Sequence, residues 1–182
     1  MATARYPLIW RFLHWVIGIM VLVMLPVGFW MADRGEAGLW DALTNTLYSS
    51  HKTVGFLILW LMVVRLVFRL TITPPSYPPQ MPTLIRRLAH STHYLMYVLL
   101  FAIALLGWAG VTAYPALSIV GGWSLPGMPF VPVSRPLHEI LFTIHGWLAI
   151  VLLILIVVHI AGALKHRFID KDGVFDRMSL KK

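Results

Sequence analysis

The last long apolar run of the chain, residues 137–164, is the feature that most limits what the chain can fold into. It reads LHEILFTIHGWLAIVLLILIVVHIAGAL and is long enough to cross the hydrocarbon core of a bilayer as a helix. Two histidines, His145 and His159, lie deep inside it. On an α-helix their fourteen-residue separation is ~21 Å along the axis and brings both imidazoles to one face. Because ionisable residues inside a bilayer are rare and usually functional, we expect these imidazoles to meet partners from elsewhere in the chain.

The composition of the whole chain agrees with a membrane protein. Hydrophobic residues make up 59% of its 182 residues and charged residues only 12%, against about 25% charged residues in soluble domains. The net charge of +8 is explained by basic residues at the cytoplasmic edges of membrane helices, so we expect no nucleic-acid partner. The absence of cysteine excludes disulfides, thiolate-ligated iron–sulfur clusters, covalently attached haem and a cysteine nucleophile.

Three further apolar runs predict three more membrane helices. We place the four spans at about residues 8–31, 51–70, 91–113 and 137–164. The first run is long for a signal peptide and has no clear A-x-A cleavage site, so we expect a retained helix. Four spans joined in sequence predict an all-α fold: an antiparallel, up-and-down transmembrane four-helix bundle that forms one domain over residues 1–182.

Two connections and the tail have compositions that differ from the spans. The segment TPPSYPPQMP is proline-rich and predicts a stiff surface loop. Residues 114–136 are rich in glycine and proline yet apolar, so we expect them to lie on the membrane surface or to fold over the mouth of the bundle. Residues 165–182 predict a short, basic cytoplasmic tail.

The distribution of lysine and arginine predicts the orientation of the bundle. Twelve basic residues fall on one side of the expected spans and three on the other, so the positive-inside rule places both termini in the cytoplasm. The twelve are Arg5, Arg11, Arg65, Arg69, Arg86, Arg87, Lys165, Arg167, Lys171, Arg177, Lys181 and Lys182, and the three are Arg34, Lys52 and Arg135.

The histidines inside the spans sort by depth when counted from the cytoplasmic helix ends. His159 lies five residues before the end of the fourth span and His14 six residues after the start of the first, so both are ~8–9 Å from that side. His51 and His145 each lie 19 residues from the cytoplasmic end of their span, or ~29 Å. The sequence therefore predicts two level pairs: His14 with His159 on the cytoplasmic side, and His51 with His145 toward the periplasm.

Pairs of histidines across a helical bundle suit haem iron, which accepts two axial imidazoles with the ring between helices. Two such pairs ~21 Å apart along the axis would let electrons pass between haems across the membrane. A zinc or copper site would need three or four converging ligands, and a proton relay normally needs acidic residues that these spans lack. A hydrogen-bonded core role is the ordinary explanation for one buried histidine, but four at matched depths favour ligation.

Arg65 is the most informative polar residue besides the histidines. It lies fourteen residues after His51, which places it on the same helix face and near the level of the cytoplasmic-side haem. A guanidinium inside an apolar helix needs an anion, and a haem propionate would satisfy it through a bidentate contact. Arg69, nearer the helix end, fits a contact with lipid phosphate better. Further candidates for propionate or quinone contacts at the cytoplasmic face are Arg11, His90 and His93.

His138 and His166 continue the seven-residue histidine stripe of the fourth helix. They are 28 residues apart, which is ~42 Å along a helix and more than the ~30 Å hydrocarbon core. We therefore expect both at the membrane interfaces, as ordinary solvated histidines.

Five short features of the chain are specific when taken together. They are His14-Trp15, His51-Lys52-x-x-Gly55, Val64-Arg65-x-x-x-Arg69, the pair His145 and His159, and the tail segment LKHRFIDKD. With these features the chain resembles the bacterial cytochrome b561 family, and the resemblance covers essentially the whole chain. It implies a multi-pass protein of the bacterial inner membrane with two b-type haems, ligated from helices one, two and four, that exchanges electrons with membrane quinone. The family is similar in plan to the haem-bearing membrane subunits of formate dehydrogenases and nickel–iron hydrogenases.

The resemblance leaves the electron donor or acceptor open between superoxide and a periplasmic redox protein. Some relatives resemble a superoxide:ubiquinone oxidoreductase. Lys52 and Arg135 could form a local basic patch, but the periplasmic loops hold three basic and four acidic side chains and give no net attraction for an anion. The acidic ones are Asp33, Glu36, Asp41 and Glu139.

We interpret the chain as a respiratory-chain electron carrier that passes single electrons through two haems, to or from membrane quinone, with superoxide as one candidate substrate. Two alternatives stay open. The chain could be a haem-bearing membrane anchor that delivers electrons to a separate catalytic subunit, or a histidine-based metal or proton transporter.

Overall fold

The computed structural model describes residues 5–78 and 81–181, and in these residues the regular structure is helical. Each of the four long helices contains a stretch long and apolar enough to cross a membrane. The helices are α1 (Leu8–Glu36), α2 (Ala42–Thr71), α3 (Thr83–Ala113) and α4 (Arg135–Lys165). The prediction of an all-α transmembrane four-helix bundle is confirmed.

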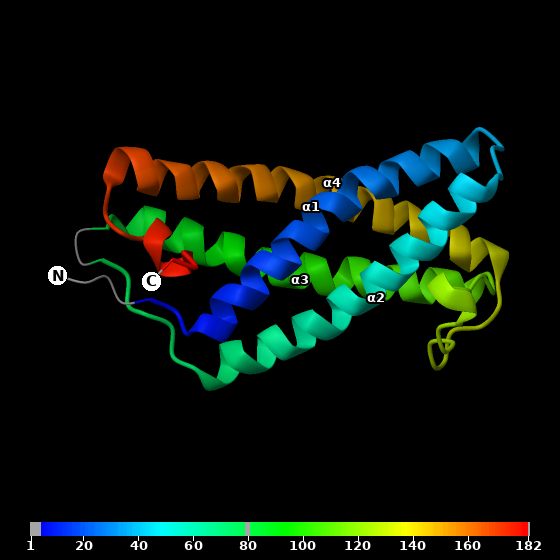
Figure 1. The fold of residues 1–182 in the computed structure, drawn as a ribbon, viewed down its shortest axis with the longest axis horizontal. Coiled ribbons are helices and arrows are strands. Elements are labelled where there is room, and N and C mark those ends of the chain that lie inside the picture. The colour runs from blue at the N-terminus through cyan, green and yellow to red at the C-terminus, as the bar shows by residue number, and fades with distance from the viewer. Residues whose placement is uncertain (1–4, 79–80, 182) are drawn as a thin grey trace.

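The four helices run along the long axis of the molecule, and the chain reverses direction at each connection (Figure 1). The start of α1 and the end of α4 lie together at one end, which we call the terminal end. The opposite end, where residues 37–41 and 114–134 connect the helices, is the loop end.

The helices extend beyond the expected spans, because hydropathy detects the part inside the hydrocarbon whereas caps decide where a helix begins. α2 begins at Ala42, nine residues before His51, and Asp41 is its N-cap. A carboxylate oxygen of Asp41 accepts a hydrogen bond from the Thr44 amide at 2.9 Å. α4 begins after Ser134, whose hydroxyl accepts from the Leu137 amide at 3.4 Å. α3 begins at Thr83, eight residues before its expected span. The connection between α1 and α2 therefore shrinks to residues 37–41.

The tight α1–α2 turn is held by charge as well as by the cap. Arg34 donates to the second carboxylate oxygen of Asp41 at 2.6 Å. The Thr44 amide, followed by the Arg34 guanidinium, stabilises the carboxylate and holds the pKa of Asp41 at about 2.

The apolar core lies at the middle of the bundle. α1 packs against α2, α2 against α3, and α3 against α4, whereas α1 and α4 approach each other much less closely. The buried core residues come from all four helices and, apart from Leu13 next to His14, lie between the levels of the predicted histidine pairs. They are Leu13, Ile17, Val21, Ile58, Met62, Leu99, Leu152 and Ile156.

The connection between α3 and α4 packs back onto the loop end, as its apolar composition predicts. The indole N–H of Trp108 donates to the Pro126 carbonyl at 2.8 Å, and the Thr112 hydroxyl accepts from the Met128 amide at 3.0 Å. Lys52 on α2 donates to the Ala116 carbonyl at 2.7 Å, which ties this loop to a second helix.

The tail folds back onto the terminal end instead of leaving the bundle. After α4 the chain forms a π-helical turn, His166–Asp170, and a 3-10 turn, Phe175–Met178. The Trp15 indole donates to the Met178 carbonyl at 2.8 Å and the Arg11 guanidinium to the Ser179 carbonyl at 2.5 Å. The tail is therefore anchored through its backbone to α1.

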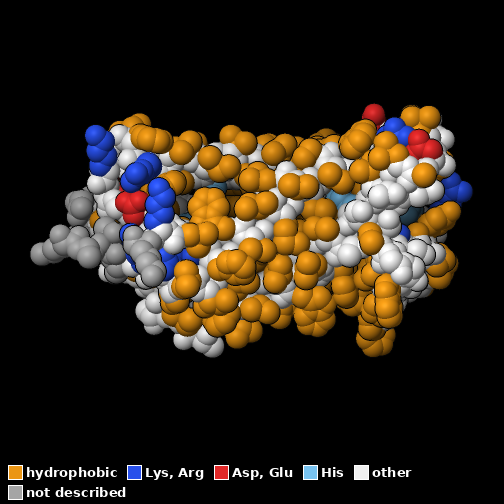
Figure 2. All heavy atoms as spheres, viewed as in Figure 1, with side chains coloured by type: hydrophobic (Ala, Val, Ile, Leu, Met, Phe, Trp, Pro, Cys, Tyr) orange, Lys and Arg blue, Asp and Glu red, His pale blue; other side chains and the backbone are white. Residues whose placement is uncertain are grey.

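The surface agrees with a position inside a bilayer. Figure 2 shows hydrophobic side chains over the middle of the visible face and charged side chains gathered at the two ends. Large apolar side chains such as Ile154 and Val157 are exposed on α4. Because a bilayer removes such surface from water, the chain is a multi-pass membrane protein.

Candidate haem sites

His14 of α1 and His159 of α4 face each other near the terminal end. Their ring centres are 6.1 Å apart and their planes meet at 80°. Both side chains are half-buried. The structure thus brings together the two histidines predicted to be level on this side, and we call them the terminal-end pair.

His51 of α2 and His145 of α4 face each other near the loop end. Their ring centres are 6.3 Å apart and their planes meet at 65°. Both are half-buried, as in the first pair. These two histidines, also predicted to be level, are the loop-end pair.

The spacing within each pair suits two imidazoles on opposite sides of one metal ion. A metal–imidazole bond is about 2 Å long, so two such bonds in line place the ring centres about 6 Å apart. The observed 6.1 Å and 6.3 Å match this value. A direct hydrogen bond between the rings would bring them closer. Both pairs therefore fit axial ligation of haem iron.

His145 of the loop-end pair has the hydrogen bonding expected of a ligating histidine. Nδ1 of His145 lies 2.9 Å from the Ile103 carbonyl of α3, and because a carbonyl only accepts, this nitrogen carries the proton. The lone pair of Nε2 is then free for a metal. Nδ1 of His51 is buried without a hydrogen-bond partner among the described residues, which is the kind of polar atom that an added group would explain.

Two glycines leave room for the rings of the loop-end pair. A Cβ atom at Gly28 would lie 3.0 Å from Cε1 of His51, and one at Gly107 would lie 3.2 Å from Cε1 of His145. Both distances are shorter than an ordinary carbon–carbon contact. These positions therefore let α1 and α3 pass directly against the two imidazoles.

Arg65 lies at the level of the terminal-end pair, as predicted. Its guanidinium donates to the Trp10 carbonyl at 3.2 Å and lies 5.9 Å from the ring centre of Tyr97. Trp10 is one helical turn before His14. Arg65 is half-buried and forms no ion pair with the carboxylates of the described residues, so its charge is free for an anion such as a propionate.

The remaining polar residues predicted near this level, Arg11, Arg69, His90 and His93, have different surroundings in the structure. Arg11 is engaged by the tail through Ser179, and Arg69 lies 5.9 Å from the Trp10 ring centre. His90 is exposed. His93 differs from these three, because its ring centre lies 5.3 Å from that of His159. A contact between His93 and the terminal-end pair was not predicted.

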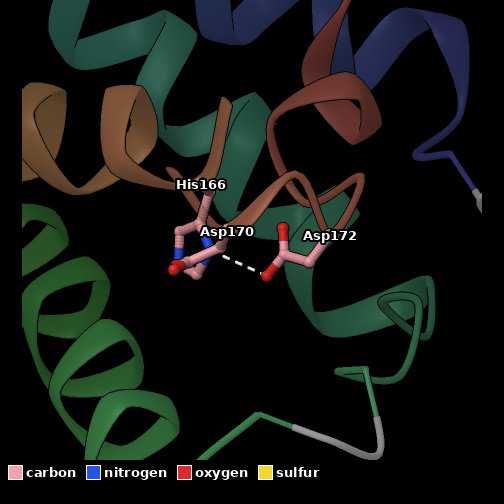
Figure 3. Close-up of side chains that lie close together, drawn as sticks. All are labelled: His166, Asp170 and Asp172. Carbon is pink, nitrogen blue, oxygen red and sulfur yellow. Dashed lines mark hydrogen bonds and ion pairs between the residues drawn. The ribbon is translucent and has the colours of Figure 1, made fainter. Parts of the chain in front are cut away.

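The prediction that His138 and His166 are ordinary solvated histidines is wrong for His166. Its side chain is only 12% exposed, and Nδ1 lies 2.8 Å from Asp172 and 3.2 Å from Asp170 (Figure 3). The π-helical turn brings these acids back to the end of α4, and Lys165 contacts both carboxylate oxygens of Asp170. The ion pair of Lys165 with Asp170 and the contact of His166 with Asp172 fasten the start of the tail to the end of α4.

His138 is also bonded, although it lies near the end of α4 as expected. Its Nδ1 lies 3.0 Å from the Gly110 carbonyl and its ring packs between Tyr114 and Phe142. The side chain is half-buried and pairs with none of the other histidines. His138 therefore connects α4 to α3.

The basic residues of the loop end do not gather into a patch. Lys52 is bound to the backbone of the α3–α4 loop, and Arg135 pairs with Glu139 at 3.1 Å on the surface. Both cations are thus engaged within the chain.

Comparison with known proteins agrees with the geometry of the two pairs. The family model for prokaryotic cytochrome b561 matches residues 5–180. Cytochrome b561 homolog 2 of Escherichia coli (strain K12) is 31% identical over 175 residues, which cover 96% of this chain and 90% of that protein. Cytochrome b561 homolog 1 of the same organism is 28% identical over 170 residues, 92% of each chain.

A more distant relative carries a more specific name. The probable superoxide oxidase CybB of Yersinia pestis is 25% identical over 170 residues, which cover 93% of each chain. Three findings agree: the chain has four membrane-spanning helices, its histidine pairs have the spacing of axial ligands, and the family model matches nearly the whole chain. The protein belongs to the prokaryotic cytochrome b561 family of b-type haem electron-transport proteins of the membrane.

Proposed function

We propose that the chain carries two b-type haems and passes single electrons through them across the bacterial inner membrane, to or from membrane quinone. One haem would be held by His14 and His159, and the other by His51 and His145. The observation that carries this proposal is the presence of two facing imidazole pairs with nearly equal ring separations, 6.1 Å and 6.3 Å, joined by one helix.

Each bound haem would supply the iron that changes oxidation state, and the protein would position and tune it. His14, His51, His145 and His159 would hold the metals, and Arg65 would bind a propionate of the terminal-end haem. With both termini in the cytoplasm, the terminal end faces the cytoplasm and the loop end the periplasm.

Superoxide is the second candidate partner, as an electron donor on the periplasmic side, and the name of the Yersinia pestis relative supports it. Arg135 is paired with Glu139, whereas Lys52 donates to an uncharged backbone carbonyl and keeps its positive charge at the loop end. Two alternatives to superoxide are a periplasmic redox protein and a separate catalytic subunit, either of which would serve as electron donor or acceptor.

The first test is the haem content of the purified, membrane-extracted protein. Reduced-minus-oxidised spectra should show low-spin b-type bands, and the haemochrome assay should give about two haems per chain. A folded protein without haem would overturn the proposal and leave the transporter alternative. Two separate assays then identify the partner. One tests whether a quinol analogue reduces the haems under anaerobic conditions, and the other tests whether generated superoxide reduces them.

Replacing His159 by alanine tests the ligand assignment. The variant should lose the terminal-end haem and keep the loop-end haem, because the two sites share α4 but no ligand. His138→Ala is the matched control, since His138 lies on the same stripe of α4 but outside both pairs, and it should keep two haems. Retention of both haems in the His159 variant would show that His159 is not a ligand.

A further inference from the structure

The terminal-end pair has a third imidazole beside it, which the proposed function does not use. The ring of His93 on α3 lies 5.3 Å from that of His159, with 71° between the planes. Two axial ligands of one metal place their ring centres about 6 Å apart. The shorter spacing suits an edge-to-face contact, so His93 is placed to support His159 and not to share its iron.

The loop-end pair shows what α3 does for the other histidine of α4. A ligating histidine normally has a neighbour that fixes its ring orientation and tunes its basicity, and such neighbours strongly affect the metal. For His145 this neighbour is the Ile103 carbonyl, at 2.9 Å. For His159 it is the ring of His93, ten residues earlier on the same helix. One helix therefore supports both α4 histidines, through a carbonyl at one level and an imidazole at the other.

We propose that His93 is a positioning residue for the terminal-end haem: its ring holds the rotation of the His159 imidazole and thereby sets the properties of the iron. The inference rests on the proposed function, since it requires His159 to be a ligand. The planes of His14 and His159 meet at 80°. Axial imidazoles that are nearly perpendicular give ferric low-spin haem a strongly anisotropic electron paramagnetic resonance signal. Release of the His159 ring would reduce that anisotropy.

The experiment compares His93→Ala and His93→Gln with His90→Gln, all as full-length, haem-loaded protein. His90 lies one turn earlier on α3 and is exposed, as His93 is, so it matches the change in polarity without the ring contact. Haem per chain, low-temperature resonance spectra and potentiometric titrations are measured on each. Gln keeps a planar polar group, which separates loss of the imidazole from loss of packing.

We expect every variant to keep two haems per chain. In both His93 variants the largest g-value and the midpoint potential of one haem should shift. In His90→Gln both quantities should stay unchanged. Unaltered g-values and potentials in His93→Ala would overturn the inference. Loss of one whole haem from both His93 variants would also overturn it, because His93 would then be a ligand itself. A parent protein without haem would instead refute the proposed function.

Discussion

Gly28 offers a sharp test of whether the loop-end pair is shaped to hold a cofactor. A Cβ atom at this position would lie 3.0 Å from Cε1 of His51 and 3.6 Å from its Nδ1. Ordinary carbon contacts begin near 3.4 Å, so in Gly28→Ala the ring must move away by about 0.4 Å or more. α1 and α2 pack against each other, so we expect a ring pushed away from position 28 to turn out of its alignment with His145.

The cost of the added methyl group can be estimated from core overpacking, which is typically about 1–3 kcal/mol. If this cost falls on the haem-bound state, it weakens retention of the loop-end haem by about 5- to 150-fold, since about 1.4 kcal/mol is tenfold. Gly28 lies beside His51 of the loop-end pair, so the proposed terminal-end haem should keep its affinity.

The assay follows transfer of haem from the purified protein to excess apomyoglobin, with the two b-type haems resolved by their potentials. Gly28→Ala should lose one haem faster than the parent and the other at the parental rate. Gly18→Ala is the matched control, because Gly18 lies on the same helix and its Cβ would meet nothing within 4 Å. Equal loss rates from Gly28→Ala and Gly18→Ala would refute the view that Gly28 makes room for a ligating ring.

Three further changes test other parts of the structure. Arg65→Gln should lower the midpoint potential of the proposed terminal-end haem in a redox titration, while Arg65→Lys should stay near the parent, because a nearby positive charge favours the reduced haem. At an effective dielectric constant of about 20, a unit charge acting over about 10 Å contributes about 1.7 kcal/mol, or about 70 mV for one electron. Because the folded pKa of Asp41 is about 2, below its unfolded value, its stabilising effect is complete at neutral pH and is lost as pH falls from about 4 to about 2. Thermal unfolding of Asp41→Asn should therefore depend less on pH in this range, and an identical pH dependence would contradict the role of the turn. Trp15→Phe removes the indole donor to the Met178 carbonyl and should destabilise the docked tail by about 0.5–1.5 kcal/mol, which is measured as faster proteolytic cleavage after α4. An unchanged cleavage rate would show that this hydrogen bond does not hold the tail.

The bundle and its paired histidines could be predicted because both depend on helical periodicity. Apolar runs of about 20 residues predict spans, and a rise of about 1.5 Å per residue converts sequence position into depth. His14 and His159 belong to different helices, yet their equal depth follows from counting alone. His51 and His145 are also at equal depth by this count, and the structure places both pairs face to face.

The place of His93 could not be predicted by the same counting, because hydropathy does not show where α3 begins. The apolar span begins near residue 91, which would put His93 at the interface, whereas the helix begins at Thr83 and is two turns longer. Arg86 and Arg87 lowered the hydropathy of the first turns without ending the helix. A basic helical segment at a membrane edge is invisible to a scale that measures transfer into hydrocarbon.

The role of His166 was missed for a different reason. Asp170 lies four residues later, where an α-helix would also bring it near His166, but Asp172 lies six residues later and an α-helix would have turned it away. A π-helical turn and the left-handed backbone of Lys171, with φ of 49°, turn the chain back instead. The carbonyl of Ile103 beside His145 was also beyond prediction, since every residue carries such an acceptor and only packing selects one.

The spacing of the two proposed haems follows from α4 alone. Leu152 lies seven residues from both His145 and His159, and seven residues turn through ~700°, close to two full turns, so its side chain shares their face. It is 3% exposed and packs in the apolar core between the two pairs. A charged or hydrated group at that level would be costly, so an electron would cross it without an accompanying proton. Because one rigid helix carries both ligands and this layer, changes in residues 37–41 or 114–134 should alter access to the loop-end haem and leave the distance between the haems unchanged.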